Sequence, residues 1–181
     1  MALMEKGGMK IERVWAMPSR NTFSIKPIGD FVRRHMAWSA VSIDPFARDE
    51  WATYTNDLNP STKAQAHTTA IDFLGDLKAR KIEADLIIFD PPYSVQQIKE
   101  VYASVGLPVA NTLAYNSTIG HWANEKDLCA SLLKDGGIFL HFGWHSNGLG
   151  KKRNAVIEEI LLVAHGRAHY DTICMAERLH K

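Results

Sequence analysis

The sequence predicts an α/β fold with a mostly parallel central sheet and an antiparallel C-terminal hairpin. First, residues 85–89 form a continuous apolar run, typical of a strand buried on both faces. Second, helix-like segments alternate with strand candidates along the chain. Third, the last two strand candidates, 157–164 and 172–177, are nearly consecutive, which favours a closing hairpin.

The other elements are expected from local composition. Residues 1–12 are expected to be a loose tail, because they contain Gly7-Gly8 and few apolar anchors, and residues 13–181 to form one domain. Residues 69–78 are read as a short strand leading into a helix, and Gly136-Gly137 as the end of a helix. Strands are further expected at 41–44, 52–55 and 138–142, helices at 28–35, 96–105 and 125–133, and the longest loop at 106–120.

Bulk composition excludes little. With 46% hydrophobic and 23% charged residues the chain resembles an ordinary globular protein. Its net charge of +1 neither indicates nor excludes a nucleic-acid partner. No apolar run approaches the ~20 residues that span a bilayer, so we expect a soluble cytoplasmic protein without a membrane partner. Cys129 and Cys174 are expected to be buried thiols rather than a disulfide.

The clearest chemical feature is Asp90-Pro91-Pro92-Tyr93, directly after the apolar run. Two prolines remove two backbone donors and fix two φ angles, so the chain leaves the sheet stiffly. The carboxyl edge of an open α/β sheet is where ligands bind. A carboxylate and an aromatic ring are therefore expected at a ligand site.

This tetrapeptide resembles the Asp-Pro-Pro-Tyr motif of S-adenosylmethionine-dependent amino methyltransferases, chiefly N6-adenine DNA methyltransferases and less often N4-cytosine ones. The resemblance implies a Rossmann-like class I methyltransferase fold and S-adenosylmethionine as cofactor. It implies that the Asp90 carboxylate and the Pro91 carbonyl grip the amine, and that Tyr93 stacks on a flipped base. The whole chain looks most like small methyltransferases of phages and prophages, which implies the cytoplasm of a bacterial or phage-infected cell.

Flanking segments look like the cofactor motifs of the same family. Asp57 would accept hydrogen bonds from the ribose hydroxyls, and Asp72 would meet the adenine amino group of the cofactor. The cofactor residues implied by the resemblance are Ser24, Lys26, Pro27, Asp44, Pro45, Phe46, Ala47, Asp57, Leu58, Asp72, Phe73 and Asp90.

The sequence departs from the family after Ala47, where Arg48, Asp49 and Glu50 replace the usual glycines. Only residues 45–51 separate the first two strand candidates, whereas a crossover with its helix needs about 10–12 residues. Either the first crossover is truncated or the motif is misassigned. Arg48 could pair with the cofactor carboxylate or be a solvated surface residue.

The loop 143–153 is a candidate nucleic-acid contact, since cations neutralise phosphates and aromatic rings stack on bases. A solvated basic surface is the alternative. No metal site is expected, because Gly166 interrupts the spacing of His165 and His169. The candidate nucleic-acid residues are Trp144, Asn147, Lys151, Lys152 and Arg153.

Several functions remain open at this point. Adenine N6 in DNA is the first candidate acceptor, with DNA favoured over RNA; cytosine N4 or an RNA base would leave the site unchanged. A degenerate fold that binds nucleic acid or a partner without catalysis is the second reading. Protein glutamine methylation is a third, although its enzymes usually carry Asn in place of Asp90. Target recognition has room only in residues 94–125 and 143–153, so a homodimer or a separate recognition subunit is conceivable.

Overall fold

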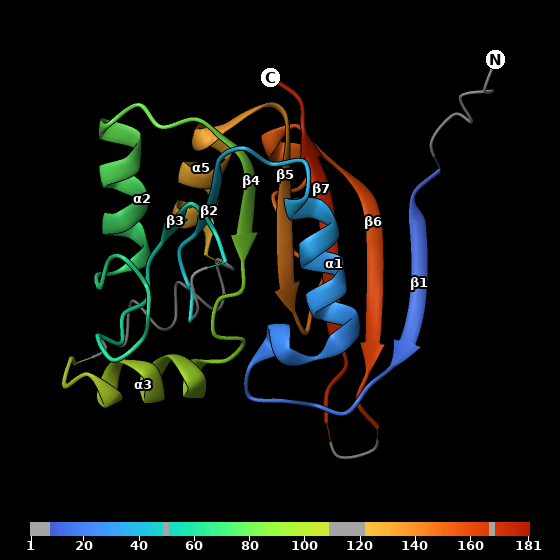
Figure 1. Cartoon of the computed structure of the whole chain (residues 1–181), viewed down its shortest axis with the longest axis horizontal. Coiled ribbons are helices and arrows are strands. Elements are labelled where there is room, and N and C mark those ends of the chain that lie inside the picture. Colours follow the sequence, from blue (N-terminus) through green and yellow to red (C-terminus); the bar gives the residue numbers. More distant parts are fainter. Residues whose placement is uncertain (1–7, 49–50, 109–121, 167–168) are drawn as a thin grey trace.

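A computed structural model describes residues 8–48, 51–108, 122–166 and 169–181, and these form a seven-stranded sheet with helices on both faces (Figure 1). The strand order is β1-β6-β7-β5-β4-β2-β3; β7 runs antiparallel to β5 and β6, and the other neighbours pair in parallel. The predicted Rossmann-like α/β class is confirmed. The strands are β1 (Lys10–Trp15), β2 (Ser42–Asp44), β3 (Tyr54–Thr55), β4 (Ala84–Phe89), β5 (Leu133–Gly143), β6 (Ala155–Ala164) and β7 (Thr172–Leu179).

Four α-helices are described: α1 (Lys26–Met36), α2 (Ala70–Ala79), α3 (Val95–Ser104) and α5 (Ala123–Leu132). Two short 3-10 helices, η1 (Thr22–Ser24) and η2 (Lys151–Arg153), precede α1 and β6. Within the described ranges no helix is long and apolar enough to cross a membrane.

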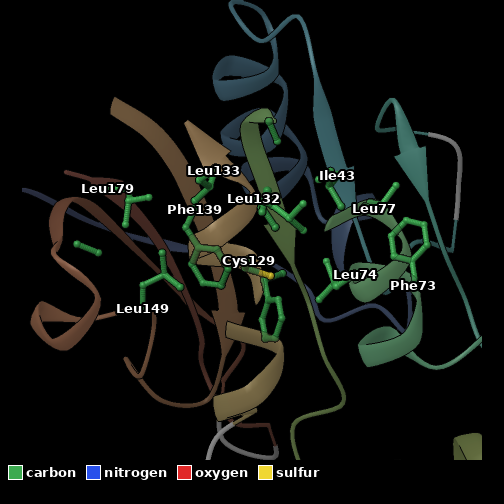
Figure 2. Close-up of a cluster of buried hydrophobic side chains, with 14 residues drawn as sticks. Ile43, Phe73, Leu74, Leu77, Cys129, Leu132, Leu133, Phe139, Leu149 and Leu179 are labelled. Atoms are coloured by element: carbon green, nitrogen blue, oxygen red, sulfur yellow. The ribbon is translucent and has the colours of Figure 1, made fainter. Parts of the chain in front are cut away.

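Strand β4 is an interior strand of the sheet, and apolar side chains on both of its faces are buried. Side chains alternate along a strand, so Leu86 and Ile88 belong to the cluster that includes α1. Ile87 and Phe89 belong to the opposite cluster, which includes α2 and α5 and which Figure 2 shows in part. This double burial fixes the point at which Asp90 leaves the sheet.

Three local predictions differ from the structure. The strand expected at the start of 69–78 is absent: Thr69 Oγ1 accepts from the Asp72 amide and starts α2 at once. Gly136 does not end a helix but lies within β5 at a φ of 75°, where β5 shows a register irregularity against β4. Residues 10–12 of the expected tail belong to β1, which pairs with β6. Most of the loop expected at 106–120 lies outside the described residues.

The sheet changes its winding direction between β2 and β4. From β2 the chain proceeds to β3 on one side, whereas from β4 it proceeds to β5 on the other. Such a switch point opens a crevice at the carboxyl ends of the strands. The connection from β2 to β3, residues 45–53, contains no helix in the part that the structure describes, so the first crossover is truncated.

Candidate active site

A cavity of about 670 Å³ opens at this switch point, within the range of small-molecule sites. Asp44, Asp57 and Asp90, each at or just after the end of a parallel strand, all line it. The three carboxyl groups come from β2, β3 and β4, which are neighbours in the sheet. The fold therefore gathers three acids in one concave site.

The tetrapeptide that follows β4 is held by hydrogen bonds to its own side chains and to α3. The Tyr93 hydroxyl donates to Asp90 Oδ1 at 2.5 Å, and the Tyr93 amide donates to Gln97 Oε1 at 2.6 Å. Ser94 caps α3 by accepting from the Gln97 amide. The four residues from Asp90 to Tyr93 all line the cavity.

Asp90 is a weaker acid than an exposed carboxyl. Burial raises its pKa to about 6, although hydrogen bonds from Tyr93 and Thr22 oppose that shift. Burial and the neighbouring Asp90 raise the pKa of Tyr93 well above its usual range, so its phenol stays protonated and can donate. Near neutral pH Asp90 is mainly a carboxylate that accepts hydrogen bonds.

The other two acids share this behaviour. Burial raises the pKa of Asp44 well above its usual range, and the negative charges of Asp90 and Asp57 raise it further. Burial also raises the pKa of Asp57, while the charge of Arg48 lowers it. A positively charged group that entered the cavity would stabilise the ionised form of all three acids.

Asn56 holds together the segments around Asp44 and Asp57, and the sequence did not predict it as a site residue. Its buried side chain donates to the Pro45 and Thr68 carbonyls at 3.1 and 3.0 Å and accepts from the Thr68 amide at 3.0 Å. Its backbone bonds with Asp44 and Ala47. One amide thus joins three segments where the crossover helix is missing; a polar residue at a strand end was its only signal.

Further cavity residues come from segments distant in sequence. Arg48 lines the cavity and donates from Nη1 to the Arg20 carbonyl at 3.3 Å. Phe46 packs edge to face against Trp122 at a centroid distance of 5.2 Å. Further lining residues without a sequence signal are Arg20, Thr22, Phe23, Trp51, Tyr102 and Trp122.

Six predicted cofactor residues do not line the cavity that the described residues form. Phe73 and Ala47 are buried, and Phe73 is a residue of α2 that packs in the hydrophobic core. Asp72 is exposed and accepts from the Thr69 hydroxyl at 2.5 Å. Lys26 pairs with Asp30 on the surface. The full set is Ser24, Lys26, Pro27, Ala47, Asp72 and Phe73, whereas Asp44, Pro45, Phe46, Asp57, Leu58 and Asp90 do line it.

The loop after β5 runs from the carboxyl edge of the sheet, where β5 ends, to the amino edge, where β6 begins. Trp144 follows β5 at the carboxyl edge and packs against Tyr93. Lys151, Lys152 and Arg153 precede β6, whose first residue pairs with Leu179 at the other edge. Arg153 is engaged by Asp127 and two carbonyls, and the Asn147 carbonyl accepts from Lys126. Of the predicted nucleic-acid residues, only Trp144 contacts the Asp90 region through a described contact.

His165 and the two cysteines take structural positions. His165 uses both ring nitrogens, one with the Ala16 carbonyl and one with the Thr172 hydroxyl. No cluster of potential metal ligands occurs among the described residues. Cys129 and Cys174 are buried free thiols, as expected, and burial raises the pKa of both.

Comparison of the sequence with protein-family models and with curated proteins found no match. Among solved structures, the N-methyltransferase NodS from Bradyrhizobium japonicum WM9 is similar at a TM-score of 0.47 and 12% identity, over 90% of this chain and 99% of NodS. A methyltransferase homolog protein from Pyrococcus horikoshii has a TM-score of 0.46 and 11% identity, over 96% of this chain and 62% of that one. SMU.776 complexed with SAH has a TM-score of 0.46 and 11% identity over 78% of this chain, which spans 45% of the SMU.776 chain.

Proposed function

We propose that this chain transfers a methyl group from S-adenosylmethionine to an exocyclic amine of a nucleic-acid base, with adenine N6 in DNA as the first acceptor to test. The observation that carries the proposal is Asp90: a half-buried residue just after strand β4 whose pKa is raised, lining the same cavity as Asp44 and Asp57. The Pro91-Pro92 pair and Tyr93 complete the motif beside it.

The cofactor side of the cavity fits S-adenosylmethionine by charge. When bound, this cofactor supplies an electrophilic methyl group on a positively charged sulfur. Asp57 would accept from its ribose hydroxyls, and the negative field of Asp44 and Asp57 would stabilise its positive charges. Arg48, which lines the cavity, would pair with the cofactor carboxylate.

The acceptor side provides hydrogen-bond acceptors for an amine. The nitrogen of a base amine is a poor nucleophile because its lone pair is delocalised into the ring. The Asp90 carboxylate and the Pro91 carbonyl would hold its two N–H groups and direct the lone pair outward. The Tyr93 hydroxyl donates to Asp90 Oδ1, and the carboxylate has further lone pairs with which to accept from the amine.

The experiment incubates purified protein with DNA or RNA and cofactor carrying a labelled methyl group, digests the product and identifies the modified nucleoside by mass spectrometry. N6-methyladenine in DNA is expected; N4-methylcytosine or a modified RNA base would revise the acceptor, and label recovered only on protein would redirect the proposal to glutamine. Asp90→Ala should remove the label, whereas Asp76→Ala, a surface acid of α2 paired with Arg80, should not. Full activity of Asp90→Ala would overturn the mechanism.

A second candidate is a non-catalytic subunit that retains the fold and binds nucleic acid or a partner, such as a second copy or a recognition subunit. The truncated connection over residues 45–53 favours it, because this segment supplies the cofactor side. Calorimetry with S-adenosylmethionine separates the two. Heat of binding supports the enzyme; none, with and without DNA, supports the subunit.

A further inference from the structure

Three aromatic rings form a row that leads from Asp90 to the protein surface. Tyr93, whose hydroxyl bonds with Asp90, contacts Trp144 at a ring-centroid distance of 5.6 Å. Trp144 in turn contacts Tyr170 at 4.7 Å. The side chains are half-buried at Tyr93, 39% exposed at Trp144 and 72% exposed at Tyr170. The row therefore begins in the cavity and ends in solvent.

The topology brings these rings to one edge of the sheet. Tyr93 follows β4, Trp144 follows β5, and Tyr170 precedes β7, which is antiparallel to β5. Trp15 ends β1 at the same edge and is 63% exposed. Its Nε1 lies 3.8 Å from the position that a Cβ on Gly166 would take, so it flanks the connection that carries Tyr170.

This row differs from the scattered surface aromatics of an ordinary soluble protein. Tyr170 packs against Trp144 yet leaves most of its ring in water, so it contributes little to the core. Every base has an aromatic face, and stacked aromatic side chains hold single strands with little regard to sequence. Duplex bases present no free faces, whereas unpaired bases do.

We propose that Trp144 and Tyr170 form a stacking platform for unpaired bases of a single-stranded nucleic acid, next to the base that enters the cavity. The inference rests on the proposed function in taking a nucleic acid as the substrate class. Lys151 and Lys152 lie at the opposite edge, so they supply no phosphate contacts at the platform. The contribution of the two rings to binding, which is stacking rather than charge, should therefore depend only weakly on salt.

Fluorescence anisotropy of a labelled single-stranded DNA of about 12 nucleotides measures the platform directly. Trp144→Ala and Tyr170→Ala should each weaken binding about five- to a hundred-fold, Tyr170→Phe should bind as the wild type does, and the loss should be similar at low and moderate salt. Trp38→Ala is the matched control: Trp38 is 50% exposed but lies between α1 and β2, at the amino edge. Far-ultraviolet circular dichroism verifies that each variant is folded.

Unchanged binding in both alanine variants, absence of binding by the wild type, or an equal loss in Trp38→Ala would overturn the platform. So would a dimer in solution that Tyr170→Ala dissolves, because the surface would then serve a second copy. The two proposals fail separately. Binding that depends on Tyr170 without any methylation would leave the platform standing and refute the enzyme. Methylation with a KM for single strands that Tyr170→Ala leaves unchanged would refute the platform and leave the enzyme standing.

Discussion

The two sides of the cavity are built in different ways. On the acceptor side, a strand with apolar side chains buried on both faces, a rigid proline pair and a capped helix follow one another between Ala84 and Ser104. On the cofactor side, two short strands are joined without a helix in the described part, and one buried amide, Asn56, ties the connection together. The first side is specified locally, whereas the second depends on contacts between separate segments.

The largest effect expected is on the acceptor side, from Asp90→Ala. Removing one of two amine acceptors should lower kcat about 10²- to 10³-fold, the magnitude known for loss of a transition-state hydrogen bond. Asp57→Ala should instead weaken cofactor binding and change kcat less. Steady-state kinetics together with calorimetry separates the two patterns. Identical patterns for both variants would show that catalysis and cofactor binding are not assigned to separate sides of the cavity.

Asn56→Ala should destabilise the cofactor side of the cavity. It leaves the Pro45 and Thr68 carbonyls and the Thr68 amide without a partner, which should lower the free energy of unfolding by about 3 kcal/mol. Urea denaturation measures this loss. Gln65→Ala is a control, because exposed Gln65 makes one side-chain bond, to the Thr53 carbonyl. Equal midpoints for the two variants would contradict the role given to Asn56.

The pH profile tests the state of Asp90. Its pKa is raised to about 6 and its acceptor form is the carboxylate, so activity should be full above that pH and decline as pH falls through it. One pH unit below, the rate should be about tenfold lower. Single-turnover rates at cofactor and substrate concentrations well below saturation provide the measurement, because they report the pKa of the free enzyme; a flat profile between pH 5 and 8 would contradict it.

Tyr93→Phe should have the smallest effect. In the wild type, the hydrogen bond from the Tyr93 hydroxyl lowers the pKa of Asp90. Without this bond the pKa of Asp90 rises, so the acid limb of the profile should move to higher pH. At alkaline pH the rate should stay within a few-fold of the wild type, since the ring can still stack on a base. An acid limb that stays in place would show that the hydroxyl does not influence Asp90.

Much of the acceptor side could be predicted from the sequence because its signals are local. The apolar run, the prolines and Tyr93 are adjacent, and the structure places them at one sheet edge. The cofactor side could be predicted only in part: Asp44 and Asp57 line the cavity, but Asp72 and Phe73 do not, since the Thr69 cap draws both into α2. Trp51 and Thr22 reach the cavity through tertiary packing that no local pattern encodes.

Strand β1 has a consequence for how the chain is made. It pairs only with β6 among the described strands, and Lys10 meets Glu159 across 149 positions of sequence. At a synthesis rate of about 5–20 residues per second, Lys10 leaves the ribosome roughly 7–30 s before Glu159 does. The first strand of the chain is therefore among the last to join the sheet, and until then Ile11 and Trp15 are available to a chaperone or to a neighbouring nascent chain.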